Sequence, residues 1–286
     1  MKRFLKLVFI LTISSVGILT LFFSIRQSLY DSKHTLTVTH YEITDFKLET
    51  PLTLVQLTDL HGSQFGSENE QLVELIRTEA PDLIAMTGDM FNMDADTQEI
   101  ERLCQLVSRL HEIAPVIYSL GNHEDAYIDA FGGEVLSRLE SAGAIVLDFD
   151  YTELSLSGQE FRIGGAYGYL LDPKFRETSE QTFMRDYLNT THPTILLSHL
   201  SEGLLLYEGM NAWDVDLVLS GHTHGGQIRL PLIGGLYSPE TGWFPKYTKG
   251  IFSMAESTLV LSAGLGTSGD IPRFGNLPEV VVVKLS

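Results

Sequence analysis

The chain has 286 residues, of which 44% are hydrophobic, so it is long enough for one large domain or two small ones. Its 19 basic and 37 acidic residues give a formal net charge of −18. Such an acidic chain is a poor candidate for a nonspecific nucleic-acid binder, which needs a basic face, and no nucleic-acid partner is expected. The single cysteine, Cys104, excludes a disulfide within the chain, and its helical context predicts a buried structural thiol.

The N-terminal segment carries no charged residue from Leu7 to Ile25. At about 1.5 Å per residue, a helix over this run is roughly 28 Å long, close to the hydrocarbon thickness of a bilayer. A cleavable signal peptide usually has a shorter apolar core and a small-x-small cleavage site, and neither is found here. We therefore predict a retained signal anchor over residues 1–26, with a membrane span at about 7–25.

The basic residues around this span predict its orientation. Lys2, Arg3 and Lys6 precede the span, whereas Arg26 and Lys33 follow it, which weakly favours a cytoplasmic N-terminus. The predicted localisation is therefore the cell membrane, in a single pass, with the rest of the chain outside the cytoplasm. Beyond the first 26 residues, 15 basic and 37 acidic residues leave a formal net charge of −22.

A short tether is predicted over residues 27–37, followed by one α/β domain over 38–286. The domain opens with alternating strand and helix patterns. In chain order we predict a buried strand at 52–59, a helix at 68–80, a strand at 81–89, a helix at 96–113 and a strand at 115–124. This order favours a mostly parallel sheet covered by helices.

The second half of the chain is richer in strand patterns. A hairpin is predicted over 152–166, turning at Ser157–Gly158–Gln159. Further apolar strands are predicted within 193–199, 215–225, 257–264 and 278–285. We assign these later strands to a second sheet. The expected fold class is α/β, with two mixed sheets packed face to face and helices on both outer sides, preceded by one transmembrane helix.

Metal-binding and acid–base residue types stand at the carboxyl ends of five predicted strands. Sites in open α/β sheets form at these ends. The residues, in chain order, are Asp59 and His61, Asp89, Asn122 and His123, His199, and His222 with His224. A lone histidine at a strand end is ordinary, Asp59 alone could cap a helix, and a Gly-Asp pair is common in turns. The prediction of a site therefore depends on the coincidence of five clusters.

The chemistry of this set points to metal ions. A set of oxygen and nitrogen donors without a thiolate is typical of sites for Mn, Fe, Zn or Co. It is less typical of a structural zinc site, which is rich in thiolates, or of Ca and Mg sites, whose ligands are all oxygen atoms. Eight residues are too many for one ion, whereas two divalent ions that share a bridging carboxylate would use them well. Two such ions about 3.5–4 Å apart can clamp a phosphoryl group and produce a nucleophilic hydroxide.

The order DLH, GD, GNHE, H and GHTH, which runs from Asp59 to His224, resembles the calcineurin-like metallophosphoesterase superfamily. The segment GHTHGGQIRLP, followed by KYTKGIF and AGLGTS, resembles a membrane-associated subgroup with a GHTHGGQ signature. Some members of that subgroup act on UDP-2,3-diacylglucosamine. The resemblance implies the four-layer αββα sandwich of the superfamily and a role for each matching residue.

By this resemblance, one metal would be held by Asp59, His61 and His224, and the other by Asn122, His199 and His222. Asp89 would bridge the two ions, because each carboxylate oxygen can serve one of them. His123 would face the phosphoryl group as the catalytic residue, steadying its charge or protonating the leaving oxygen. Many members have a second aspartate three residues after the bridging one, where this chain has Asn92.

Three glycines, Gly221, Gly225 and Gly226, surround the paired histidines of GHTHGG. In an extended backbone, His222 and His224 would point the same way, so a bent loop is needed to aim them at different ions, and the glycines permit it.

The predicted function is a dinuclear-metal-dependent phosphoesterase that hydrolyses a phosphomonoester, phosphodiester or pyrophosphate bond through a metal-bound hydroxide. Its substrate would be a phosphorylated small molecule or lipid, such as UDP-2,3-diacylglucosamine. The alternatives are a non-catalytic metal-binding scaffold of the same fold and a metal-dependent hydrolase of another ester. The GLGTSG segment predicts a loop near the site rather than a dinucleotide fingerprint, since no helix follows it. Glu124 and Asp125 are interpreted as a solvated pair.

Overall fold

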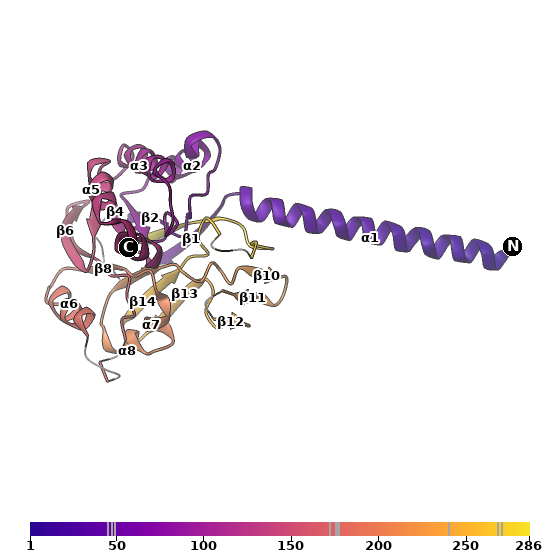
Figure 1. Cartoon of the computed structure of the whole chain (residues 1–286). Coiled ribbons are helices and arrows are strands. Elements are labelled where there is room, and N and C mark those ends of the chain that lie inside the picture. The colour runs from indigo at the N-terminus through magenta and orange to yellow at the C-terminus, as the bar shows by residue number, and fades with distance from the viewer. Residues whose placement is uncertain are drawn as a thin grey trace.

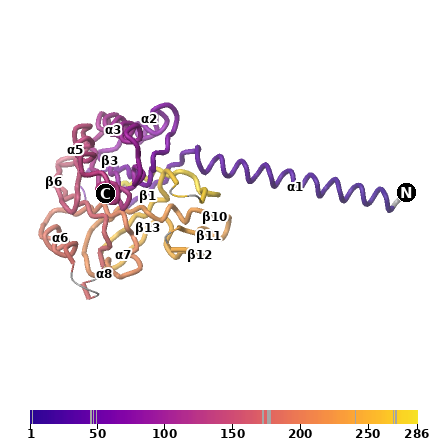
Figure 2. The backbone as a smooth tube through the Cα atoms, in the orientation of Figure 1, coloured from indigo at the N-terminus to yellow at the C-terminus, as the bar shows by residue number. Residues whose placement is uncertain are grey.

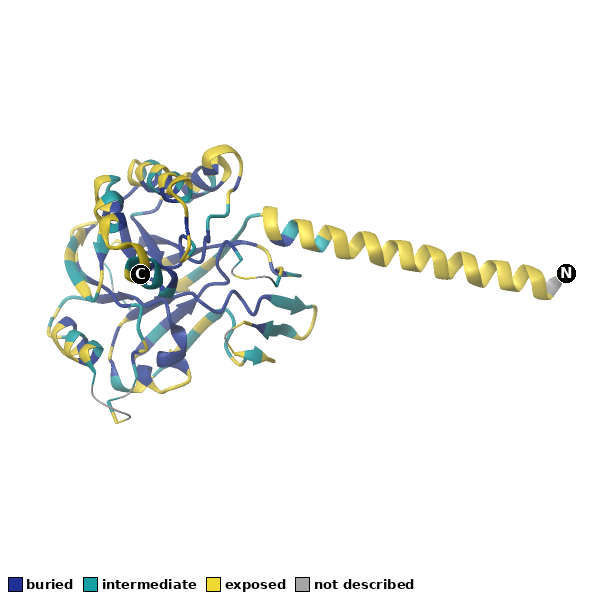
Figure 3. Cartoon of the chain, in the orientation of Figure 1, coloured by how far each residue is buried: buried dark blue, intermediate teal, exposed yellow. Residues whose placement is uncertain are grey.

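A single long helix, α1 (Lys2–His34), projects from the rest of the molecule in this computed structural model (Figure 1). The structure describes residues 1–44, 46, 48, 50–171, 173–174, 178–239, 241–267, 269 and 271–286. Among these, α1 is the one helix long and apolar enough to cross a membrane, and its apolar side chains are exposed (Figure 3). Residues 27–34, predicted as part of a tether, continue this helix.

The first sheet has six strands in the order β1-β15-β2-β3-β4-β5. These are β1 (Thr37–Ile43), β15 (Glu279–Leu285), β2 (Leu52–Leu57), β3 (Leu83–Thr87), β4 (Val116–Ser119) and β5 (Ala144–Leu147). The strands β2, β3 and β4 are parallel, as predicted. Strand β5, which was not predicted, is parallel to β4, and β15 is antiparallel to β2. The assignment of the last strand to the second sheet was wrong, because β15 pairs with β1 and β2 in the first.

The second sheet also has six strands, in the order β13-β14-β9-β8-β7-β6. These are β13 (Gly250–Met254), β14 (Ser257–Leu261), β9 (Leu217–Ser220), β8 (Thr194–Leu197), β7 (Gln159–Gly165) and β6 (Asp150–Leu156). The predicted hairpin joins β6 and β7, with Leu156 opposite Gln159. Its two turn residues, Ser157 and Gly158, both have positive φ, which suits the right-handed twist of the strands.

Helices cover both outer faces of the paired sheets (Figure 1). On the first sheet lie α2 (Glu70–Glu79), α3 (Thr97–His111) and α5 (Glu134–Ser141); on the second lie α6 (Ser179–Tyr187), α7 (Ser201–Leu205) and α8 (Gly209–Ala212). A short helix, η1 (Ser67–Asn69), precedes α2, and α4 (Asn122–Phe131) follows β4. Helix α3 begins where the Asp96 carboxylate accepts a hydrogen bond from the backbone of Glu99.

Three apolar clusters hold these layers together. Alternate side chains of each strand face opposite sides, so Val55 packs under the helices of the first sheet while Leu54 packs between the sheets. The middle cluster joins Leu54 and Leu83 of one sheet to Ile195 and Leu197 of the other. The predicted fold of two mixed sheets flanked by helices is confirmed.

A small third sheet lies outside this sandwich and was not predicted. It consists of β10 (Ile228–Leu230), β11 (Gly234–Ser238) and β12 (Gly242–Trp243), all antiparallel to their neighbours. After this small sheet the chain forms β13 and β14 of the second sheet. Residues 262–278 then connect β14 to β15 in the first sheet. This last connection contacts α1: the Ser28 and Ser32 hydroxyls accept hydrogen bonds of 3.1 and 3.2 Å from the backbone nitrogens of Gly275 and Asn276.

Candidate metal centre

The eight predicted residues gather at one edge of the sandwich, where the carboxyl ends of strands from both sheets meet. Asp59 and His61 follow β2, Asp89 follows β3, and Asn122 and His123 open α4 after β4; His199 follows β8, and His222 and His224 follow β9. Buried polar side chains tie the two sheets together here. Gln56 of β2 donates a hydrogen bond of 2.9 Å to the carbonyl of Ser220 in β9. All eight residues except Asn122 are buried.

The side chains form three overlapping groups, and within each group the ligand atoms lie within 4.8 Å of one another. The groups are Asp59, His61 and His224; His61, Asp89 and His123; and Asp89, His199 and His222. Asp89 belongs to two of these groups. The arrangement brings together the carboxylates and imidazoles that the sequence predicted from five separate segments.

Most of the distances between these atoms are longer than hydrogen bonds, and only the His199–Asp89 pair is close enough for one. Nε2 of His61 lies 3.7 Å from an oxygen of Asp89 and 4.0 Å from one of Asp59. Nε2 of His224 lies 3.6 Å from Asp59, and Nε2 of His199 lies 3.1 Å from Asp89. Two donor atoms that bind one ion at about 2.0–2.2 Å are separated by roughly 3–4 Å. The spacing is therefore that of atoms around a shared cation.

Several buried donor atoms of the cluster have no hydrogen-bond partner among the described residues. They are Nδ1 and Nε2 of His61, Nε2 of His199, Nδ1 of His224 and Oδ1 of Asn122. Buried polar atoms are almost always satisfied, so a group of unsatisfied ones needs a physical explanation. A divalent cation would satisfy one nitrogen of each imidazole and Oδ1 of Asn122, while the second ring nitrogen of His61 carries the proton of the neutral ring. These donors therefore fit the metal ions that the sequence implies.

Two histidines of the cluster, His61 and His224, are in the protonation state that metal binding needs. Burial lowers the pKa of His61 to about 3, assisted by the neighbouring His224, and burial likewise lowers the pKa of His224 to about 3. These two imidazoles are neutral at pH 7, the form that binds a metal. Burial opposes the charges of Asp89 and His199 as well, but their mutual attraction holds the pKa of Asp89 well below its ordinary value and raises the pKa of His199 to about 10.

The ring of His199 is fixed by a backbone carbonyl. Its Nδ1 lies 2.7 Å from the carbonyl oxygen of Thr87, the last residue of β3, and donates to it. This bond directs Nε2 toward Asp89. Orientation of one ring nitrogen by a carbonyl is the usual support of a metal-binding histidine.

Five of the cluster residues themselves adopt left-handed backbone conformations. The φ angles are 51° at Asp59, 46° at His61, 54° at Asp89, 75° at His222 and 48° at His224. Such angles are uncommon for residues with a Cβ, and they concentrate at functional sites. The loop after β9 thus bends at the histidines themselves, as well as at Gly225 and Gly226.

Glycines allow the backbone to approach the two aspartates closely. A Cβ on Gly121 would lie 2.2 Å from Oδ1 of Asp89, and one on Gly221 would lie 2.5 Å from Oδ2 of Asp59. Gly264 of the GLGTSG segment also lies against Asp59, where a Cβ would meet its side chain at 2.6 Å. This part of the segment is therefore a loop beside the cluster, as expected; residue 268 of the segment and residue 270 after it lie outside the described residues.

The interpretation of Glu124 as solvated was wrong. Its side chain is completely buried, and its carboxylate accepts hydrogen bonds from the backbone nitrogens of Asp89, Met90 and Gly121 at 2.7–2.8 Å. The hydroxyl of Tyr118 donates a fourth bond of 2.7 Å. Glu124 therefore fixes the loop that carries Asp89, a role that depends on contacts between separate strand ends.

His123 lies next to Asp89 and His61. Its backbone nitrogen donates a hydrogen bond of 2.9 Å to Oδ1 of Asp89, and its Nδ1 accepts one of 3.2 Å from the backbone nitrogen of Met93. Its Nε2 lies 3.9 Å from Oδ2 of Asp89. Since Nδ1 is an acceptor, Nε2 carries the proton in the neutral ring and can donate at the centre of the cluster.

Asn92 lies outside the groups of ligand atoms. Its side-chain nitrogen donates to the carbonyl of His61 at 3.2 Å and to the Glu99 carboxylate at 3.1 Å. The backbone nitrogen of Asn92 donates to the same Glu99 oxygen at 2.8 Å. This residue thus supports the loop of His61 from behind.

Arg273 is a further supporting residue that the sequence analysis did not identify. Its buried guanidinium donates to the carbonyls of Ala263, Gly266, Asn276 and Leu277. Burial lowers its pKa to about 10, so it remains charged at pH 7. It fixes the connection between β14 and β15 against Asp59.

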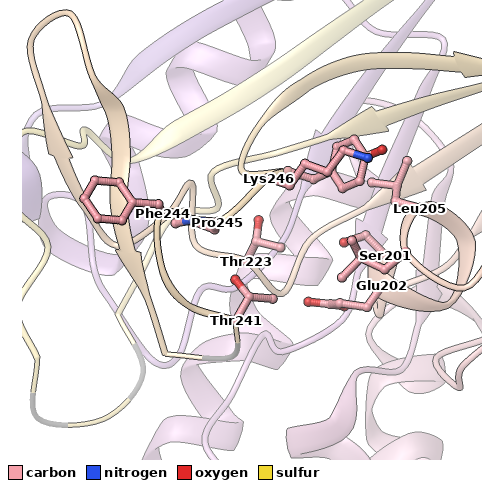
Figure 4. A pocket seen from close by; sticks show the side chains of 10 residues that line it. Ser201, Glu202, Leu205, Thr223, Thr241, Phe244, Pro245 and Lys246 are labelled. Carbon is pink, nitrogen blue, oxygen red and sulfur yellow. The ribbon is translucent and has the colours of Figure 1, made fainter.

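One cavity is lined in part by a cluster residue, and another is lined by a residue that neighbours the cluster in the sequence. A cleft of about 800 Å³ is lined by His61 and Ser63 on one side and by Leu29, Ser32 and Lys33 of α1 on the other. A smaller cavity of about 210 Å³ is shown in Figure 4. Thr223, the residue between His222 and His224 in the sequence, is part of its wall. Its walls include Glu202, Phe244 and Lys246.

The sequence profile of the calcineurin-like phosphoesterase family matches residues 52–226, more than half of the chain. The chain belongs to this family. The match extends from β2 to the loop that carries His222 and His224, and so includes every residue of the cluster. The expectation of a metal-dependent phosphoric ester hydrolase is confirmed at the level of the family.

Individual relatives agree with this assignment. The chain is 29% identical to the uncharacterized metallophosphoesterase YkuE of Bacillus subtilis, over 81% of this chain and 78% of the relative. It is 27% identical to the phosphodiesterase YaeI of Escherichia coli, over 82% of each. A crystal structure of a 5′-nucleotidase precursor from Thermus thermophilus shares the fold of this phosphoesterase, with a TM-score of 0.50 and 18% identity, over 82% of this chain and 54% of that one.

Proposed function

We propose that the cluster binds two divalent metal ions and hydrolyses a phosphoester bond. Asp59, His61 and His224 would hold one ion, and Asn122, His199 and His222 the other. Asp89 would bridge them, and Mn, Fe, Zn or Co would suit these donors. The observation that carries the proposal is the membership of Asp89 in two groups of converging ligand atoms, one of which also contains His61 and the other His199 and His222.

The chain's own residues would orient the substrate and supply a proton. When bound, the ions would supply Lewis acidity and activate a water molecule for attack on phosphorus. His123 would donate from Nε2 to the phosphoryl group or to the leaving oxygen, because its Nδ1 is occupied by the backbone of Met93. Its assignment as a catalytic residue rather than a ligand rests on this orientation, although it also belongs to one group of converging atoms.

The substrate class that we favour is a phosphorylated or lipid-linked phosphoester at the membrane surface. The support comes from the cleft that places His61 opposite Leu29 and Lys33 of α1. A substrate held at a membrane by an acyl chain would reach the cluster along this helix, and Lys33 would offset the negative charge of the surrounding body.

The membrane itself is the proposed partner of α1. We place the anchor within residues 1–26 and the catalytic domain at 38–286, with this domain on the extracytoplasmic side. The apolar side chains of α1 are exposed along its length, and a bilayer would remove them from water (Figure 3).

An assay of the full chain in detergent with Mn²⁺ tests the proposed reaction. The substrates are p-nitrophenyl phosphate, bis-p-nitrophenyl phosphate, UDP-2,3-diacylglucosamine and, for the rival esterase, p-nitrophenyl acetate. We expect hydrolysis of at least one phosphoester, lost on chelation. Metal binding without turnover of any substrate would support the scaffold alternative, and turnover of the acetate alone would support a hydrolase of another ester.

A further inference from the structure

The turn between β10 and β11 exposes apolar side chains on the surface of the body. Leu232 at its tip is 108% exposed and Ile233 is 57% exposed. Leu232 also has a φ of 69°, a left-handed conformation that is unfavourable for a branched apolar residue. The turn is tight, with the backbone nitrogen of Ile233 donating to the carbonyl of Leu230 at 3.2 Å. The side chain of Leu232 is thus held away from the protein core.

The hairpin of β10 and β11 lies on the side of the body from which α1 projects (Figure 2). A groove of about 770 Å³ is lined by Leu21, Ser24 and Ile25 of the helix and by residues 229–234 of the hairpin. Ile25 is the last residue of the uncharged run. The tip of the turn therefore lies at the level where the helix would leave the hydrocarbon of a bilayer.

The helix is fixed in this position by polar contacts of its C-terminal half. The hydroxyls of Ser28 and Ser32 accept hydrogen bonds from Gly275 and Asn276, and Ser32 is buried. The side-chain nitrogen of Asn276 in turn donates 2.6 Å to the carbonyl of His224. These contacts connect the direction of α1 to the hairpin and to the metal cluster.

The charge of the hairpin also suits a lipid surface. Residues 227–239 contain Arg229 and no aspartate or glutamate, although the body carries 37 acidic residues overall. Lipid headgroups of bacterial-type and other membranes are often anionic and would repel an acidic segment. An apolar tip flanked by a cation is the composition found in segments that enter the interface.

We propose that the turn, residues 230–233, inserts into the same bilayer that α1 crosses. The body then has two points of membrane contact, and it can no longer rotate about the axis of α1. This orientation holds the cleft between His61 and Lys33 against the headgroups. The inference rests on the proposed membrane anchoring by α1, and it is independent of metal binding and catalysis.

Depth-dependent fluorescence quenching in proteoliposomes tests the proposal. Single cysteines are introduced at three positions of the full chain in a Cys104→Ala background: Leu232→Cys at the turn, Leu11→Cys within α1, and Ser141→Cys on the exposed end of α5. Each is labelled with nitrobenzoxadiazole and reconstituted in phosphatidylcholine and phosphatidylglycerol with or without doxyl-labelled lipid. Strand β5, against which α5 packs, lies at the opposite edge of the first sheet from β1, so Ser141 is the matched control.

We expect doxyl lipids to quench most of the fluorescence at positions 232 and 11 and little at position 141. If doxyl lipids quench position 11 but quench position 232 as little as position 141, the proposed insertion of the turn is wrong, whereas the membrane anchor stands. Absence of quenching at position 11 would overturn the membrane anchor as well. Activity on a water-soluble diester is measured separately, so its loss would bear only on the catalytic proposal.

A second variant tests whether the apolar tip is responsible. Leu232→Asp removes the apolar contact and adds a charge, and the core is untouched because Leu232 is fully exposed. A label at Ile233→Cys should lose most of its quenching when this substitution is added, while hydrolysis of a soluble diester in detergent stays unchanged. Undiminished quenching at position 233 would contradict insertion by this tip.

Discussion

The backbone nitrogen of Asp89 donates a hydrogen bond of 2.7 Å to the carboxylate of Glu124. Glu124 belongs to none of the three groups of converging ligand atoms. The same carboxylate also accepts from Met90, Gly121 and the Tyr118 hydroxyl. One buried acid therefore holds the end of β3 against the start of α4. The position of the proposed bridging carboxylate depends on it.

Glu124→Gln should weaken metal binding and activity together. Glutamine offers one oxygen and one NH₂ group, so some of the four donors would face another donor. We expect a loss of about 10–100-fold in metal affinity or in kcat/KM, the usual effect of removing the support of a metal ligand. Titration with Mn²⁺ and steady-state kinetics measure both, and Glu134→Gln on the exposed face of α5 is the control. Unchanged values in both measurements would show that Glu124 positions nothing.

Gly121→Ala should displace Asp89 by contact alone. The added Cβ would lie 2.2 Å from Oδ1 of Asp89, and Gly121 has a φ of −114°, which alanine adopts freely. We expect about 10²-fold lower kcat/KM, since a shift of about 1 Å at a reacting centre has this effect. Gly133→Ala is the matched control, because nothing lies within 4 Å of its Cβ. Equal activity of the two variants would contradict the close packing around Asp89.

Asn92→Asp should destabilise the loop of His61 rather than improve the site. In the parent chain the side-chain nitrogen of Asn92 donates a hydrogen bond of 3.1 Å to the Glu99 carboxylate. The substitution would place a second negative charge there instead of that donor. We expect a loss of about 1–3 kcal/mol, seen as a lower Tm by circular dichroism in detergent. The double variant Asn92→Asp, Glu99→Gln restores a donor and should recover most of the loss. A single variant as stable as the parent chain would argue against this contact.

Glu279→Gln should lower stability at neutral pH and lose its effect in acid. Burial opposes the charge of Glu279, but Lys249 at 2.7 Å, with Thr39 and the backbone of Ala263, holds its pKa below the ordinary value of 4.5. A depressed folded-state pKa stabilises the fold above the unfolded-state value, and this contribution is lost as the pH falls through the folded-state pKa.

The measurement is the Tm of parent and variant between pH 7 and about pH 3, since the folded-state pKa lies below 4.5. We expect the variant to be about 1.5–3 kcal/mol less stable at pH 7, the contribution of hydrogen bonds to a charged group, with the difference narrowing in acid. Glu42→Gln, on the exposed side of β1, should show little difference at either pH. A constant difference for Glu279→Gln across the range would contradict an ionised Glu279.

The convergence of the cluster could be predicted from the sequence because it follows from a local rule. Asp59, Asp89 and His199 each follow an apolar run, and the carboxyl ends of parallel strands share one edge. Glu124 follows no such rule: next to His123 and Asp125 it has the composition of a solvated helix start. Its burial arises only when β3 and β4 bring the backbones of Asp89 and Gly121 around it.

Strand pairing shows the same limit. The run of valines in PEVVVVKL predicts a buried strand, since both faces are apolar, but it does not identify the neighbours. Those are set by contacts such as Val281 opposite Gln56, more than two hundred residues apart in the sequence. Residues 27–34, the last part of α1, were predicted as part of a tether; in the structure the side chain of Gln27 donates a hydrogen bond to that of Asp31 one turn later, and Ser32 is buried.

The metal content of the purified full chain tests the central claim most directly. After loading with Mn²⁺ and removal of free metal, inductively coupled plasma mass spectrometry should find about two ions per chain, since Asp89 joins two sets of ligands. Asp89→Ala should lose metal and nearly all activity, whereas His123→Ala should keep the metal and turn over about 10²–10⁴-fold more slowly. A folded parent chain without bound metal, or an Asp89→Ala variant with full metal and activity, would contradict the account.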